Sequence, residues 1–168
     1  MIKKGFSLIE ILLGISLFII MSATAGAVLV NSLRSARKAS ATTLAKNEGQ
    51  YALKTIQQAI LFAADATCVS GTTLNYHVEN DPTNTLHTYS LNGAAIRADG
   101  NPMTSTSVSI AQGSCTNVFT CSTNGSGFVT TVEICFVINN ANGIDVSDTA
   151  GISGLKFDTL ATLLNTKN

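Results

Sequence analysis

The chain has 168 residues, of which 45% are apolar and only 12% are charged, about half the charged fraction of a soluble domain, so part of it is expected to lie outside water. Residues 1–60 carry seven basic and two acidic side chains, whereas residues 61–168 carry three basic and eight acidic ones. This composition excludes collagen, coiled-coil and disordered classes, and the acidic larger part disfavours a nucleic-acid binder.

A long apolar segment begins close to the N-terminus. From Ile11 to Val30 there are 20 residues without a charge, which as a helix would be ~30 Å long, the thickness of a bilayer's hydrocarbon core. We therefore predict a transmembrane helix over residues 9–31. A secretory signal peptide is the alternative, because Ala23, Ala25 and Ala27 could form a small-residue cleavage site.

Glu10 is out of place in either interpretation. It lies between Ile9 and Ile11 and is the only charge between Lys4 and Arg34. A carboxylate costs roughly 2.5–3.5 kcal/mol in the middle of a membrane and less near its edge. Glu10 is therefore either a tolerated interfacial charge or a residue that pairs with a cation inside the membrane.

The segment around Glu10 carries a family resemblance. Residues 3–10, KKGFSLIE, followed by the apolar run, resemble the prepilin leader motif of type IV pilins and type II secretion pseudopilins. In that family a prepilin peptidase cleaves after the glycine and methylates the new N-terminal residue, and the glutamate belongs to the motif. The resemblance, which covers residues 3 to about 30, implies a leader of residues 1–5 and cleavage between Gly5 and Phe6.

The same resemblance implies how the protein assembles. The Phe6 amine and the Glu10 carboxylate would pair between neighbouring pilin-like subunits of a helical filament, where an unpaired buried charge is costly. The implied partners are the inner membrane, the prepilin peptidase, an assembly platform and the other subunits. The chain would cross the inner membrane once, with a periplasmic or extracellular head. Two features depart from the pattern. Many major pilins carry a proline midway along this segment, whereas the first proline here is Pro82. Basic residues also flank both ends of the apolar segment, so their count does not indicate which end is cytoplasmic.

The helical pattern continues beyond the apolar segment as an amphipathic stalk. We predict one helix over residues 6–64. Its apolar residues recur at helical spacing and form one stripe: Ala45, Gly49, Ala52, Leu53, Ile56, Ala59, Ile60 and Ala63.

Residues 65–168 are predicted to form a β-rich head, because apolar residues there alternate and turn residues separate the runs. The expected strands are residues 73–78, 86–91, 94–97, 108–110 and 128–138. Residues 152–164 fit a helix or a strand, and a strand is favoured. The expected fold is α+β and pilin-like, with the long N-terminal helix packed on an antiparallel β-sheet head.

All four cysteines, Cys68, Cys115, Cys121 and Cys135, lie in this head. In an exported head they are expected to form two disulfides, and three pairings are possible. We favour Cys115–Cys121, which closes a short loop, together with Cys68–Cys135, which would tie the helix end to the strongest strand. A zinc site is disfavoured, because the spacing is not that of a zinc finger.

Other candidate sites are weak. His77 and His87 are expected to have surface or packing roles. Residues 139–148 are rich in oxygen ligands, and weak calcium candidates there are Asn140, Asn142, Asp145 and Asp148. The segment lacks the terminal Glu of an EF-hand, so a plain turn is favoured. Since no catalytic or nucleotide-binding motif is present, we expect neither an enzyme nor a cofactor.

The resulting hypothesis is a structural subunit of a type IV pilus or a related filament. The missing proline and a weak likeness of Tyr89–Arg97 to minor pilins and minor pseudopilins favour a minor pilin. The alternatives are a pseudopilin of a type II secretion or competence system, a membrane-anchored extracellular binding module, and an exported enzyme with a signal peptide. The Gly5–Phe6 junction and Glu10 have a purpose only in a filament subunit.

Overall fold

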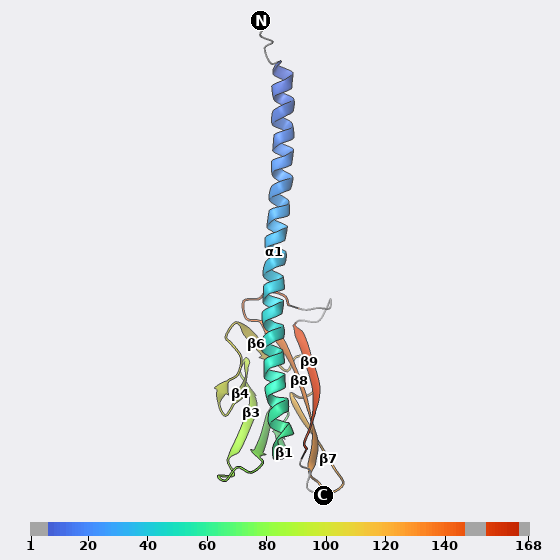
Figure 1. The fold of residues 1–168 in the computed structure, drawn as a ribbon. Coiled ribbons are helices and arrows are strands. Elements are labelled where there is room, and N and C mark those ends of the chain that lie inside the picture. Colours follow the sequence, from blue (N-terminus) through green and yellow to red (C-terminus); the bar gives the residue numbers. More distant parts are fainter. Residues whose placement is uncertain (1–6, 147–153, 165–168) are drawn as a thin grey trace. The chain divides into compact units, whose positions relative to one another are not determined.

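The computed structural model describes residues 7–146 and 154–164. In this part of the chain one helix of 54 residues, α1 (Leu8–Leu61), is followed by nine strands (Figure 1). The chain divides into two compact units, Met1–Ala39 and Ser40–Asn168. The second unit contains the C-terminal part of α1 and all of the strands. These are β1 (Ala63–Ser70), β2 (Thr73–Val78), β3 (Leu86–Asn92), β4 (Ala95–Ala98), β5 (Asn101–Pro102), β6 (Val108–Ala111), β7 (Phe119–Thr123), β8 (Val129–Asn140) and β9 (Leu155–Thr162).

The strands form two antiparallel sheets. The first has the order β1-β2-β3-β4-β5, and in the second β8 pairs with β6, β7 and β9. Backbone hydrogen bonds join the two sheets at two places among the described residues. The N–H of Ile110 on β6 donates to the carbonyl of Ala94 next to β4, and the carbonyl of Gly71 accepts hydrogen bonds from the N–H groups of Val118 and Phe119, at the start of β7. The predicted α+β architecture, a long helix on an antiparallel β-rich head, is confirmed.

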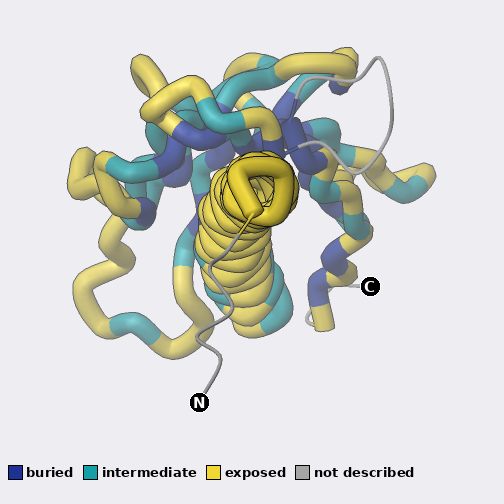
Figure 2. Tube along the Cα trace, turned by 90° about the horizontal axis from the view of Figure 1, so that it is seen from above, coloured by how far each residue is buried: buried dark blue, intermediate teal, exposed yellow. Residues whose placement is uncertain are grey.

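The core lies between the strands and the C-terminal part of α1. The helix residues buried there follow a spacing of three or four: Ala41, Ala45, Gly49, Ala52, Ile56 and Ile60. This spacing places them on one face of the helix, as predicted from the sequence. Seen along the helix, the strands lie around that face, whereas the opposite face stays exposed (Figure 2). Small residues at the first positions of the stripe let the strands approach the helix closely.

β8 is the centre of the second sheet and is buried on both faces. Val132, Ile134, Phe136 and Ile138 are fully buried and share one face, as the alternation predicted. The opposite face is also buried, and there Val137 packs against Gly113 in the loop after β6. Cover on both faces explains why the run Ile134–Ile138 is continuously apolar.

The boundary between helix and head differs from the prediction. The helix was expected to reach residue 64 and the head to begin at residue 65, but α1 ends at Leu61 and β1 begins at Ala63. The carbonyl of Phe62 accepts a hydrogen bond from the N–H of Glu79, and Ala63 is fully buried opposite Val78. Pairing with β2 therefore outweighs the helix propensity of the alanines in this segment.

Most of the expected strands are present with small shifts in their ends. β2 has the predicted bounds, β3 and β6 are each one residue longer, and β4 is shifted by one residue. The ambiguous C-terminal segment is a strand, β9, as favoured. Gly93, in the turn between β3 and β4, has a φ of 67°, which glycine adopts more easily than other residues. β1, β5 and β7 were not predicted.

Candidate functional site: an apolar helix and a disulfide-bonded head

The N-terminal part of α1 exposes an unusually apolar surface. Every residue from Ser7 to Ala39 is exposed, and the best 18-residue window of the helix has a mean hydropathy of 2.3. Soluble proteins rarely expose contiguous apolar surface on this scale. The helix is therefore long and apolar enough to cross a membrane once. Its large exposed apolar residues are Leu8, Ile9, Ile11, Leu12, Leu13, Ile15, Leu17, Phe18, Ile19, Ile20, Met21, Val28, Leu29, Val30 and Leu33.

Two hydroxyl groups within this surface are satisfied by the helix itself. The Ser16 hydroxyl donates to the carbonyl of Leu13 and the Thr24 hydroxyl donates to that of Met21, both over 2.9 Å. Such bonds remove the cost of placing a free hydroxyl in hydrocarbon. The helix is continuous through Thr24 and Gly26.

Glu10 lies in the first turn of α1. The carbonyl of Ser7 accepts hydrogen bonds from the N–H groups of Glu10 (3.0 Å) and Ile11 (3.3 Å), which makes Ser7 the N-cap residue of α1. A carboxylate in the first turn is favoured by the helix dipole, and a Ser followed three residues later by a Glu fits a capping box. The position of Glu10 therefore fits a helix-capping role as well as the pairing with another subunit that the sequence resemblance implies. Gly5 and Phe6, the predicted processing residues, lie outside the described part of the chain.

The four cysteines form two disulfides, as expected, but the favoured pairing was wrong. The bonds are Cys68–Cys121 and Cys115–Cys135, each with Cα atoms 5.8 Å apart. The unpredicted strands explain the difference, because Cys68 lies in β1 and Cys121 lies in β7, which belong to different sheets. Cys121 is therefore held away from Cys115, and the first disulfide joins the two sheets.

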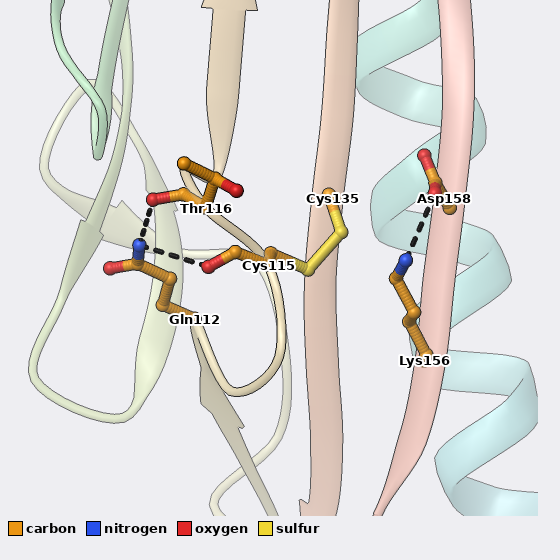
Figure 3. Close-up of a disulfide and its surroundings, with 6 residues drawn as sticks. All are labelled: Gln112, Cys115, Thr116, Cys135, Lys156 and Asp158. Carbon is orange, nitrogen blue, oxygen red and sulfur yellow. Dashed lines mark hydrogen bonds and ion pairs between the residues drawn. A yellow bond between two sulfur atoms is a disulfide. The ribbon is translucent and has the colours of Figure 1, made fainter.

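The second disulfide fastens the loop between β6 and β7 to the centre of the second sheet. Cys115 and Cys135 are both buried. The Gln112 side-chain amide folds over the loop and donates to the carbonyls of Cys115 (3.1 Å) and Thr116 (Figure 3). On the adjacent strand β9 an ion pair joins Lys156 and Asp158 over 3.1 Å. The disulfide and these hydrogen bonds hold the loop against β8.

Both histidines pair with aspartates in the first sheet. The Nδ1 atom of His77 lies 2.7 Å from Asp65, and that of His87 lies 2.8 Å from Asp99. Although partial burial opposes it, hydrogen bonds from His87 and from the Thr88 N–H lower the pKa of Asp99. The pairing of β1 with β2 brings Asp65 to His77, and the pairing of β3 with β4 brings Asp99 to His87. No local sequence pattern therefore indicates either pair.

A stack of aromatic rings lies beside the second of these pairs. The ring of Tyr76 stacks on those of His87 and Tyr89, with centroid distances of 5.3 Å. Burial, and then the hydrogen bond to Tyr76, raise the pKa of Tyr89 well above its usual value. These contacts are those of a packed and hydrogen-bonded sheet, which agrees with the packing role expected for the histidines.

The weak calcium candidates lie at the end of β8. The Asn140 side-chain oxygen accepts a hydrogen bond from the N–H of Asn142, and the Asn140 carbonyl accepts one from that of Gly143. Asn140 therefore closes a turn, as the favoured prediction had it. Asp148 lies outside the described residues, and among those described no group of three or more His, Cys, Asp or Glu is placed to hold a metal.

No family model matches the sequence, and neither a curated protein nor a solved structure matches the chain.

Proposed function

We propose that this protein is a structural subunit, specifically a minor pilin, of a type IV pilus or a related filament. The observation that carries the proposal is the combination of the KKGFSLIE segment with a continuous helix whose first part exposes apolar residues on every side. Such a surface must be covered by lipid, by other helices, or by each in turn. The resemblance of the segment to the prepilin leader supports lipid before assembly and neighbouring subunits afterwards.

Glu10 gives the helix a means of registering with its neighbours. Cleavage between Gly5 and Phe6 creates an amino group one turn before Glu10, and the apolar run between Glu10 and Arg34 contains no cation. In a low-dielectric bundle of helices the carboxylate must find such a cation, because a buried unpaired charge is strongly unfavourable. The amine of an axially staggered neighbour satisfies it and fixes the stagger at the same time.

The head supports an exported location for the second unit. All four cysteines are paired, and no described cysteine is free. Disulfides persist in oxidising compartments such as the periplasm and the cell surface. We therefore place α1 in the inner membrane before assembly, with a periplasmic or extracellular head. A pseudopilin would use the same helix in the same way, whereas a membrane-anchored binding module would need neither Glu10 nor the Gly5–Phe6 junction.

The test is the mass of the mature N-terminus, measured on protein purified from membranes of the native host. We expect a chain that starts at an N-methylated Phe6. Gly5→Leu should block maturation, because the peptidase must approach the backbone at that position, whereas the control Ala25→Leu should leave it unchanged. Cleavage after Ala25 or Ala27, or an intact leader, would refute the proposal and favour a signal peptide or a simple anchor.

A further inference from the structure

The head contains a cleft between the edges of its two sheets. The cleft has a volume of about 520 Å³, within the range of roughly 300–1,000 Å³ that ligand sites occupy. β1 is the last strand of the first sheet and β7 is an outer strand of the second. The residues that line the cleft come mainly from these two strands and from the hairpin after β7: Ala64, Asp65, Ala66, Thr67, Cys68, His77, Asn84, Cys121, Thr123, Gly127, Phe128, Val129 and Leu163.

Among the described residues, the bonds that join the two edges lie at one end of the cleft. The disulfide Cys68–Cys121 joins them, and just beyond it the Gly71 carbonyl accepts hydrogen bonds from the N–H groups of Val118 (2.6 Å) and Phe119 (3.1 Å). No ladder of strand pairing connects β1 to β7 in the part of the chain that the structure describes. The main chain from Ala64 to Cys68 therefore runs along the cleft with β2 as its only strand partner.

An edge strand in this position has unused hydrogen-bonding capacity. Alternate residues of an edge strand direct their N–H and C=O groups away from the sheet, and such edges bind further strands. Peptide recognition by strand addition uses this property: the main chain supplies affinity, and the side chains supply specificity. We propose that the cleft binds an extended segment of a partner polypeptide, which inserts as a strand between β1 and β7 and joins the two sheets.

The charges around the cleft indicate that this segment is basic. Asp65 accepts hydrogen bonds from the backbone N–H and Nδ1 of His77, yet 63% of its side chain remains exposed. Among the described residues that line the cleft there is no Lys or Arg, and the turn that contributes Asn84 also carries Asp81. A cationic side chain next to Asp65 would meet a carboxylate that no lysine or arginine among these residues neutralises.

The apolar residues that line the cleft require apolar side chains in the bound segment as well. Phe128, which directly precedes β8, is 48% exposed, and Leu163 is buried; both line the cleft. Side chains of an inserted strand point alternately to opposite faces, so a segment with alternating basic or polar and apolar residues would satisfy both Asp65 and Phe128. This inference concerns the head alone and does not depend on whether α1 enters a filament.

The experiment uses the disulfide-intact full chain in detergent micelles and the synthetic hexapeptide TVKVTV as the probe. Binding is followed by NMR titration and by hydrogen exchange of the backbone amides of residues 64–68 and 121–123. We expect the bound peptide to slow exchange at both edges by about tenfold or more. Two peptides N-methylated at alternate amides, each blocking the hydrogen bonds to one edge, should both bind at least about fivefold more weakly, a loss of only ~1 kcal/mol.

The charge requirement is tested with the peptide TVEVTV and with two variants of the protein. The wild type should prefer the lysine peptide, and Asp65→Asn should remove that preference. The control Glu133→Gln, an exposed carboxylate on β8 that does not line the cleft, should keep it. The proposal is overturned if neither peptide binds at millimolar concentration, if protection appears at only one edge, or if the N-methylated peptides bind as well as the parent.

Discussion

The ring of Phe157 on β9 lies directly against Gly49 of α1, in the space that a Cβ atom at position 49 would occupy. On its other side the ring stacks on Phe136 of β8, with a centroid distance of 5.5 Å. Gly49 is thus required for contact rather than for backbone freedom. The contact brings β9, and through it the centre of the second sheet, onto the buried face of the helix.

The substitution Gly49→Ala should destabilise the head. Alanine is favoured over glycine in a helix by roughly 0.5–1 kcal/mol, but the added methyl group would overlap the half-buried ring of Phe157, which stacks on Phe136, and overpacking costs about 1–3 kcal/mol. We expect a net loss of about 1 kcal/mol in the free energy of unfolding, measured by urea denaturation in mild detergent with near-UV circular dichroism.

A double-mutant cycle separates the contact from the helix propensity. In a Phe157→Leu background the ring is absent, so Gly49→Ala should become neutral or stabilising. The control Gly26→Ala, at a helix position with nothing within 4 Å, should leave the stability of the head unchanged. Equal effects of Gly49→Ala in both backgrounds would show that the ring does not restrict position 49.

The disulfides should contribute unequally to stability. Cys68–Cys121 closes a separation of 53 residues and Cys115–Cys135 one of 20, which correspond to ~4 and ~3 kcal/mol on the loop-entropy model. Replacing both Cys68 and Cys121 by serine should therefore lower the free energy of unfolding more than replacing both Cys115 and Cys135. Denaturation of both variants, with peptide mapping of the unreduced wild type, provides the test. Recovery of a linked Cys115–Cys121 peptide would contradict the described fold.

Acid should weaken the first sheet. The pKa values of Asp81 and Asp99 are both lowered in the folded protein, that of Asp81 by hydrogen bonds from the Thr83 side chain, the Thr83 N–H and the Thr85 N–H. A lowered pKa stabilises the fold above the ordinary Asp value of about 3.9, and this stability is lost as the pH falls through the folded value.

The melting temperature of the head should therefore drop below about pH 4, and less steeply in an Asp81→Asn, Asp99→Asn double variant than in the wild type. The comparison requires melting curves at a series of pH values between neutrality and about pH 2. Identical slopes for the two proteins would mean that these carboxylates carry no pH-dependent stability.

The type of each helix or strand and its buried face could be predicted from the sequence wherever the apolar residues recur with a clear period. The stripe from Ala45 to Ile60 and the alternation from Val132 to Ile138 each require one buried face, and both are present. β1 escaped prediction because its sequence, AADATCVS, contains helix-forming alanines and no alternation. Only its pairing with β2 makes it a strand.

β7 was not predicted for a different reason, although the turn that follows it indicates a strand at this position. Its residues FTCST look like part of a polar loop, but Asn124-Gly125 follows directly, and the Asn124 side chain accepts hydrogen bonds from the N–H groups of Ser126 and Phe128. Such a turn beside the strong strand β8 indicates a hairpin. The wrong disulfide pairing followed from this omission, since Cys68 and Cys121 become neighbours only when both edge strands exist.

Glu10 distinguishes the filament hypothesis from a local role in the helix. If it only caps α1, then Glu10→Gln should be harmless, because glutamine serves in a capping box as well as glutamate. If it pairs with the Phe6 amine of a neighbour, the same change removes the charge and leaves the amine unmatched. Insertion and cleavage should survive in either case, since a neutral side chain is easier to place in the membrane.

The most direct measurement is the ratio of Glu10→Gln protein in sheared filaments to that in membranes, compared with wild type in the native host. Mass spectrometry of the membrane fraction confirms that the variant is cleaved after Gly5. We predict that incorporation falls about tenfold or more, which requires a loss of only ~1.4 kcal/mol per subunit. Incorporation at the wild-type level would contradict the assembly role of Glu10 and favour an anchored module that uses this residue only to begin its helix.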